Sequence, residues 1–200
     1  MEFNDVVTGR RMVRRFGPDP VAPQAVRRLL RNATRSPSAG NSRGYAFLVI
    51  DTEDGRDRFW RALAPTMPVV PSVTDAPLLI VPMSSKDVYL DRYAEPDKGW
   101  TDRDEARWPV PFWHIDTGMA ALLVLLTAVD EGLGALYFGI PGPVLPAFRE
   151  AFGVPETYVP VGAVAVGHSE PGAPPSTPSK PSRPWTDLVH HGTWGSPYAD

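Results

Sequence analysis

Hydrophobic and polar positions follow two different periods along the first half of the chain. Between residues 22 and 36, apolar side chains recur every three or four positions with arginines on the opposite side, which is typical of an amphipathic surface helix. Residues 45 to 50 and 76 to 83 are short, continuous apolar runs bounded by turn formers, as in strands. A short helix is expected between them, at residues 54 to 64. The pattern therefore predicts alternating helices and strands.

Residues 115 to 131 form the most apolar segment and are expected to be a helix. Its longest apolar run, residues 118 to 129, lies between Asp116 and Asp130. That run is much shorter than the roughly 20 residues needed to span a bilayer. We therefore expect a core helix, which must be covered on nearly all sides because it is apolar on nearly all sides.

The remaining regular elements follow the central helix. Residues 136 to 140 and 161 to 166 are expected to be strands, with a helix at residues 144 to 152 between them. The order is mixed helix and strand, but no strand–GxGxxG–helix unit occurs, so a Rossmann domain is not expected.

Two segments do not fit this pattern. Residues 87 to 113 interleave aromatic side chains with Asp, Arg and Pro, which indicates a long ordered excursion that is either a substrate lid or a structural cap over the central helix. Beyond Ser169 the composition shifts to Pro, Ser and Gly, and apolar side chains follow that a solvated tail has little reason to carry. We expect residues 1 to 170 to form one domain and residues 171 to 200 to be its extended arm.

Composition narrows the classes of function. A chain of 200 residues with 42% hydrophobic content is long enough for one core, and a net charge of -3 argues against a surface built as a whole for nucleic acid. The absence of cysteine excludes disulfides, iron–sulfur clusters and thiol nucleophiles. The four histidines have no ligand spacing with acidic residues, so no metal site is expected. The N-terminus lacks an apolar signal region, and we expect a cytoplasmic protein with no membrane partner.

Four arginines lie within six positions near the start of the chain: Arg10, Arg11, Arg14 and Arg15. Guanidinium groups match phosphate oxygens with two hydrogen bonds each, so such a cluster is suited to a phosphorylated cofactor. The cluster alone leaves two other interpretations open, a solvated charge run and a weak nucleic-acid patch.

Two further motifs follow in order. Residues 36 to 42, Ser-Pro-Ser-Ala-Gly-Asn-Ser, precede the first strand, and Gly132-Leu133-Gly134 follows the central helix. Together the three motifs resemble the nitroreductase family, whose members carry an RRSxRxF-like opening, an (A/S)PSxxNxQPW-like loop and a GLG element. The resemblance extends from residue 8 to residue 194. It implies an α+β fold with a mostly antiparallel central sheet flanked by helices, in an intertwined homodimer whose interface contains the central helix.

The resemblance also implies an activity. The protein is expected to be an FMN-dependent oxidoreductase in which NAD(P)H passes hydride to flavin N5, and a nitroaromatic, quinone or other electrophile then takes the electrons. Hydride transfer through flavin requires no protein nucleophile, so no catalytic residue is expected. The resemblance leaves open whether the donor is NADPH, NADH or a deazaflavin. One alternative is a protein of the same fold that sequesters FMN with little turnover, and a second is a nucleic-acid-binding protein.

The resemblance assigns the flavin site residue by residue. Arg10 and Arg11 would hold the phosphate, Met12 would lie along the ribityl chain, and Arg14 would face the pyrimidine edge of the ring. Loop residues would contact the flavin from the partner subunit, strand residues would reach N5 and O4 through backbone N–H groups, and two C-terminal cations would close over the phosphate. The loop residues are Pro37, Ser38, Ala39 and Asn41. The strand residues are Tyr137, Phe138 and Gly139, and the two cations are Lys180 and Arg183.

The sequence departs from the family pattern at two places. Met12 stands where the family has serine, and Arg43-Gly44-Tyr45 replaces Gln-Pro-Trp. These changes put the choice of electron donor in doubt more than cofactor binding. If the aromatic excursion is a lid, its candidate substrate contacts are Trp108, Phe112 and Trp113.

Overall fold

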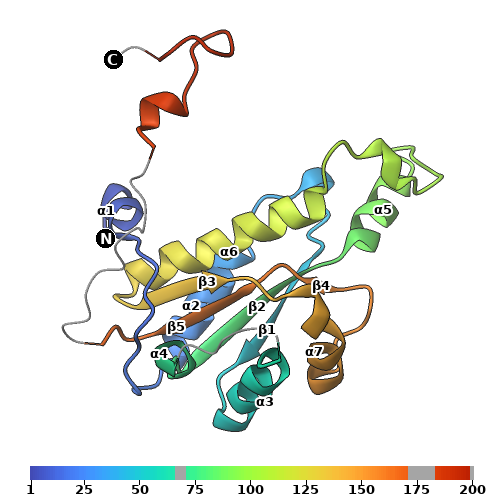
Figure 1. Cartoon of the computed structure of the whole chain (residues 1–200). Helices are drawn as coiled ribbons and strands as arrows, with labels where there is room; N and C mark the ends of the chain where they lie inside the picture. The colour runs from blue at the N-terminus through green and yellow to red at the C-terminus, as the bar shows by residue number, and fades with distance from the viewer. Residues whose placement is uncertain (66–70, 171–182, 199–200) are drawn as a thin grey trace.

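The computed structural model describes residues 1–65, 71–170 and 183–198. One antiparallel sheet lies at the centre, with strand order β1-β2-β5-β3 and the short β4 paired to β2 (Figure 1). The strands are β1 (Tyr45–Ile50), β2 (Leu78–Ser84), β3 (Gly134–Phe138), β4 (Val159–Pro160) and β5 (Ala163–Gly167).

Helices cover both faces of this sheet. The helices α2 and α6 lie on one face, and α3 and α7 lie on the other (Figure 1). The helices are α1 (Phe3–Gly9), α2 (Pro23–Ala33), α3 (Glu53–Leu63), α4 (Pro71–Thr74), α5 (Lys86–Ala94), α6 (Phe112–Asp130) and α7 (Leu145–Phe152).

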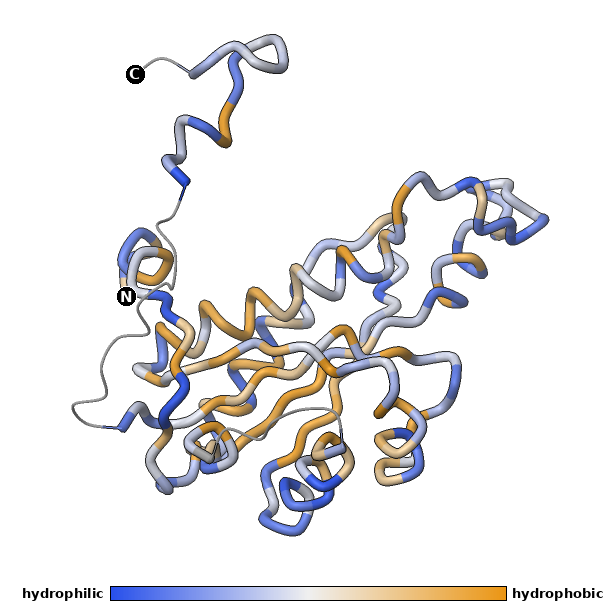
Figure 2. The backbone as a smooth tube through the Cα atoms, in the orientation of Figure 1, coloured by the Kyte–Doolittle hydropathy of each residue, from blue (hydrophilic) through white to orange (hydrophobic). Residues whose placement is uncertain are grey.

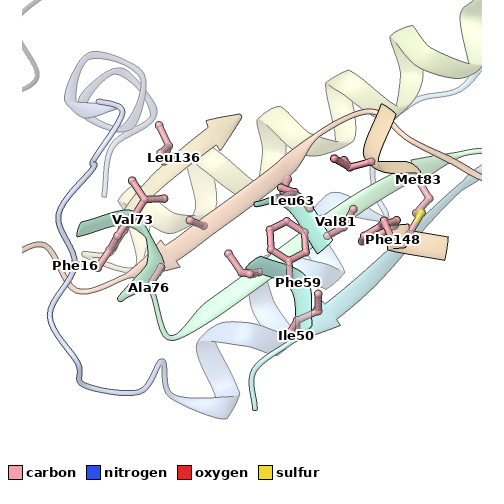
Figure 3. Close-up of a cluster of buried hydrophobic side chains, with 14 residues drawn as sticks. Phe16, Ile50, Phe59, Leu63, Val73, Ala76, Val81, Met83, Leu136 and Phe148 are labelled. Atoms are coloured by element: carbon pink, nitrogen blue, oxygen red, sulfur yellow. The ribbon is translucent and has the colours of Figure 1, made fainter. Parts of the chain in front are cut away.

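The central strand β2 supplies both halves of the core. All seven of its residues are buried, and because side chains alternate across a sheet, Leu79 and Val81 pack on the α3–α7 side while Leu78 and Ile80 pack on the α2–α6 side. Figure 3 shows the first of these clusters around Phe59. Burial on both faces explains why this segment is a continuous apolar run rather than an alternating one.

The long helix α6 lies across one face of the sheet and packs against α1, α2, β2 and β3. By length and composition it is apolar enough to cross a membrane, with a mean hydropathy of 1.6, yet half of that window is buried inside the fold. Much of α6 is coloured hydrophobic in Figure 2, and its outer face remains uncovered in the single chain, with Ile115 43% exposed and Leu122 47% exposed. The rest of the described chain therefore covers α6 on one side only, whereas the sequence predicts cover on nearly all sides.

The structure confirms the expected α+β class and the expected helices and strands to within a few residues. Three helices were not expected. Only Val6 is buried in α1, α4 is a single turn, and the two buried residues of α5, Tyr89 and Leu90, are adjacent in sequence. The three helices are seven, four and nine residues long, so their apolar positions do not repeat over enough turns to indicate a helix.

The C-terminal residues 183–198 lie away from the sheet and its helices (Figure 1). Their large apolar side chains are exposed, with Trp185 at 51%, Leu188 at 58% and Trp194 at 88%. Residues 171–182, which include Lys180, lie outside the described part of the chain.

Candidate functional site

The arginine segment is attached to the edge of β3. Met12 pairs in parallel with Ala135, and the Val13 N–H donates to the Ala135 carbonyl at 2.9 Å. A Cβ on Gly134 would lie 2.9 Å from the Val13 side chain, so glycine is required for this close approach. The first and third motifs are therefore brought together within one chain.

The preceding glycine has a different role. Gly132 has a φ of 71°, the left-handed conformation that ends many helices. The Leu133 N–H donates to the Ala128 carbonyl at 2.8 Å and closes the last turn of α6. The Gly-Leu-Gly element thus ends α6 and lets the arginine segment lie beside β3.

Positive charge collects beside this strand without acidic partners. Arg11 and Arg14 are exposed and Arg10 is half-buried. Within the described residues, no carboxylate lies within ion-pair distance of these three guanidinium groups, and Arg15 has only a long contact of 3.9 Å with Glu170. Because a phosphate dianion would supply the missing negative charge, the cluster fits the phosphate of FMN.

At the C-terminal end of β3, the side chains of Tyr137 and Phe138 have partners within the chain, whereas the backbone at Gly139 is accessible. The Tyr137 hydroxyl donates to the Val161 carbonyl at 2.5 Å, and the Phe138 ring stacks on Trp60 with centroids 5.6 Å apart. Gly139 is exposed, and no atom lies within 4 Å of the position that a Cβ would take. A planar ring could therefore approach the chain at Gly139, which fits a flavin edge.

The loop of the second motif is strained and internally hydrogen-bonded. Asn41 and Arg43 have φ values of 54° and 51°, in the left-handed region that non-glycine residues rarely adopt, and Gly40 has 60°. The Arg43 N–H donates to Ser38 Oγ at 2.9 Å, and Ser42 Oγ donates to the Ala39 carbonyl at 2.6 Å. Such strain clusters at ligand clamps. Pro37 and Asn41, two residues of this loop, are exposed.

This loop and the arginine cluster lie at opposite ends of α6 (Figure 1). The loop contacts Asp116 near the helix start, whereas the chain's N-terminal amine pairs with Asp130 at the helix end. Fourteen residues separate the two aspartates, which corresponds to about 21 Å along a helix. One chain therefore does not bring the two motifs together around one small ligand.

The aromatic side chains of the excursion pack mainly on one another. Trp108 contacts Tyr89, Tyr93, Trp100 and Trp113, with ring centroids 4.6–6.4 Å apart across the cluster. Trp113 is only 6% exposed, which favours the structural cap for that residue. Trp108 and Phe112 are partly exposed and remain candidate substrate contacts.

Of the two C-terminal cations, Arg183 lies in the described part of the chain and Lys180 does not. Arg183 donates to the Asp187 carbonyl at 3.0 Å within the exposed C-terminal segment. Lys180 lies outside the described residues. Their expected role at the phosphate therefore stays a prediction.

Several polar residues were missed by the sequence patterns. Asp116, only 2% exposed, accepts hydrogen bonds from the loop and from Tyr89. Ser84 Oγ lies 2.8 Å from His114 Nδ1, and partial burial lowers the pKa of His114. An acidic residue inside an otherwise apolar helix is the one sequence signal that could have singled out Asp116. In the described part of the chain, no group of three or more His, Asp or Glu is placed to hold a metal ion.

The fold and the three motifs define an α+β protein with an arginine-rich segment along β3. The family model described as "Nitroreductase family" matches residues 7–75 and 70–168, so the chain belongs to the nitroreductase family.

Relatives and solved structures agree with this membership. A protein of Methanothermobacter thermautotrophicus, provisionally named an NADH dehydrogenase/NAD(P)H nitroreductase, is 25% identical over 171 residues, which cover 84% of this chain and 78% of the relative. A provisionally named nitroreductase structure from Bacillus subtilis has a TM-score of 0.76 at 14% identity, covering 95% of this chain and 98% of that one. A structure from Exiguobacterium sibiricum, described as a nitroreductase in complex with FMN, has a TM-score of 0.71 at 23% identity, covering 96% and 97%.

Proposed function

We propose that the protein is an FMN-dependent oxidoreductase that takes hydride from NAD(P)H and passes electrons to a nitroaromatic, quinone or other electrophilic small molecule. The observation that carries this proposal is the arginine segment fixed to β3, in which Arg10, Arg11 and Arg14 have no acidic partner among the described residues. Family membership and the names of the relatives agree with a nicotinamide-linked reaction. The cytoplasm is the expected compartment.

We propose further that the site is completed by a second copy of the chain. The loop of residues 37 to 41 and the arginine cluster are separated by most of the length of α6. If two chains pair antiparallel across the outer faces of their α6 helices, the loop of one lies at the arginine cluster of the other. The same pairing covers the exposed Ile115 and Leu122, so one arrangement accounts for both observations.

The chain's own residues would bind and orient the cofactor. Arg10 and Arg11 neutralise the phosphate, Arg14 donates to the pyrimidine edge, and the backbone at Gly139 lets the ring approach β3. Ser38, Ala39 and Asn41 would contact the flavin from the other chain. FMN, when bound, supplies the hydride-accepting centre, and its two-electron chemistry needs no nucleophile from the protein.

Two measurements test the proposal. The purified protein should show flavin absorbance with about one FMN per chain, or acquire it on incubation with FMN. Anaerobic NADPH or NADH should then bleach that absorbance, and a nitroaromatic or quinone should restore it. A flavin-loaded protein that neither donor bleaches would favour the FMN-sequestering alternative. A protein that never takes up flavin would favour the nucleic-acid-binding alternative.

A further inference from the structure

The buried carboxylate of Asp116 connects α6 with the strained loop. Asp116 Oδ2 accepts the Ala39 N–H at 2.8 Å and the Tyr89 hydroxyl at 2.8 Å. In addition, Ser36 Oγ donates to the Asp116 carbonyl at 3.3 Å. Asp116 is 2% exposed and Tyr89 is fully buried, so water does not replace these contacts.

From this geometry we infer that Asp116 is a positioning residue, which holds the loop of residues 37 to 41 in the shape that contacts the flavin. The inference rests on the proposed function, because it assigns the loop to the flavin site. Asp116 itself is enclosed in the protein and would act through the Ala39 backbone rather than by touching the cofactor.

The loop is held from α5 as well as from α6. Arg92 Nε donates to the Gly40 carbonyl at 3.0 Å, and a Cβ on Gly40 would lie 2.7 Å from the Tyr93 ring. A Cβ on Gly44 would lie 2.5 Å from the Tyr89 ring, so the chain passes directly over the side chain that donates to Asp116. The contacts from both helices fix a backbone that would otherwise relax from its left-handed conformations.

A carboxylate suits this position because a single oxygen receives two donors. The Tyr89 hydroxyl remains protonated and able to donate, since burial and the hydrogen bond to Asp116 raise the pKa of Tyr89. An apolar residue at position 116 would leave two donors without an acceptor, the buried Tyr89 hydroxyl and the half-buried N–H of Ala39 in the loop. The loop would then lose the contact that sets its distance from α6.

The location of Asp116 adds a consequence for the proposed dimer. The residue lies on the helix whose outer face would form the interface, one position after the exposed Ile115. The same helix therefore carries the interface and the anchor of the loop that reaches into the other chain's site. Cofactor affinity and dimer formation should consequently depend on each other.

The test compares two substitutions of the same residue. Asp116→Ala should weaken FMN binding by about 10- to 100-fold, measured by fluorescence titration of the flavin-free protein. Asp116→Asn should recover most of that loss, because an amide oxygen in place of Oδ2 still accepts both hydrogen bonds. Tyr89→Phe, which removes one donor and keeps the ring, serves as a milder variant should Asp116→Ala fail to fold, and a several-fold loss of affinity is expected.

Thr127→Val is the matched control. Thr127 is buried on the same helix and accepts a hydrogen bond from Asn32 at 3.0 Å, far from the loop. Its substitution should lower the melting temperature but leave FMN affinity unchanged. An equal loss of affinity in Thr127→Val and Asp116→Ala, or wild-type affinity in both Asp116→Ala and Tyr89→Phe, would overturn the inference.

A second readout needs no cofactor. Hydrogen exchange of the Ala39 amide in the flavin-free protein should be slow in the wild type and in Asp116→Asn, and at least tenfold faster in Asp116→Ala. Unchanged exchange in Asp116→Ala would also refute the anchor. If the wild type binds no FMN while Ala39 exchange responds as expected, the proposed function fails and the positioning contact stands, so the two failures are distinguishable.

Discussion

Three glycines at the candidate site differ in what requires them. Gly134 is glycine because Val13 passes beside it, and Gly132 is glycine because the chain turns there with a positive φ. Gly139 is different, since neither its backbone nor any neighbouring atom in the described chain requires glycine. Its open surroundings leave room for the flavin edge that we propose to approach the backbone at this position.

Arg10→Ala tests the phosphate assignment. Loss of a charge-assisted hydrogen bond to phosphate should weaken FMN binding by about 1.5–3 kcal/mol, measured by titrating the flavin-free protein. Arg31→Ala is the control, because Arg31 is an exposed arginine on α2, away from β3, and should leave affinity unchanged. Wild-type affinity in Arg10→Ala would place the phosphate elsewhere.

Gly139→Val tests the approach of the ring to β3. The substituted side chain meets no atom of the described chain within 4 Å at its Cβ, so the fold should persist and the melting temperature should stay close to wild type. Flavin affinity or the rate of flavin reduction should fall, because the side chain occupies the space assigned to the ring. Gly142→Val has equally open surroundings and should affect neither quantity. Normal binding and reduction in Gly139→Val would refute the assignment of Tyr137 to Gly139.

Among the elements, those with a strong apolar period could be predicted from the sequence, and those held mainly by tertiary contacts could not. The strand β1 was expected at the residues where it occurs, because a short apolar run between turn formers has few alternatives. The helix α5 was missed because its buried Tyr89 serves a polar contact with Asp116 rather than a repeating apolar face. Similarly, the loop motif could be located from sequence, but its anchor could not, since 77 positions separate Ala39 from Asp116.

Leu122→Glu tests the role of the outer face of α6. In the proposed dimer, the two new glutamates would lose their hydration at an apolar interface without gaining a partner. The dimer should therefore dissociate to monomers at micromolar concentration. Sedimentation velocity measures the change, and FMN affinity should fall with it if the site is shared. Arg61→Glu changes the charge by a larger amount on α3, on the opposite face of the sheet, and should leave the dimer intact. A flavin-loaded Leu122→Glu dimer would move the interface away from α6.

At the scale of the whole molecule, two unexplained surfaces remain in the single chain. One is the outer face of α6, and the other is the C-terminal segment, where Trp185, Leu188 and Trp194 are exposed. Monomeric proteins seldom leave such groups of large apolar side chains in water. Residues 183–198 lie away from the sheet in Figure 1, and these side chains are left exposed in the described chain.

Deleting residues 171 to 200 tests whether this segment belongs to the functional dimer. An arm that crosses to the other subunit would bury these apolar side chains and carry Lys180 and Arg183 past the phosphate, whereas an arm folded back on its own subunit would bury them without crossing. Because every described residue of the two core clusters lies before position 170, the truncated protein should still fold. Crossing predicts that truncation lowers both flavin affinity and dimer stability, measured by fluorescence titration and sedimentation.

A pair of point variants separates the two contributions of the arm. Arg183→Ala should weaken FMN binding while the dimer persists, because it removes a cation and no apolar contact. Trp194→Ala should weaken the dimer first, because it removes the most exposed of the large apolar side chains of this segment. If the arm instead folds back, both variants leave the dimer unchanged and Trp194→Ala lowers only the stability of the monomer. A truncated protein that remains a fully flavinated dimer would exclude the crossing arm, and with it the roles given to Lys180 and Arg183.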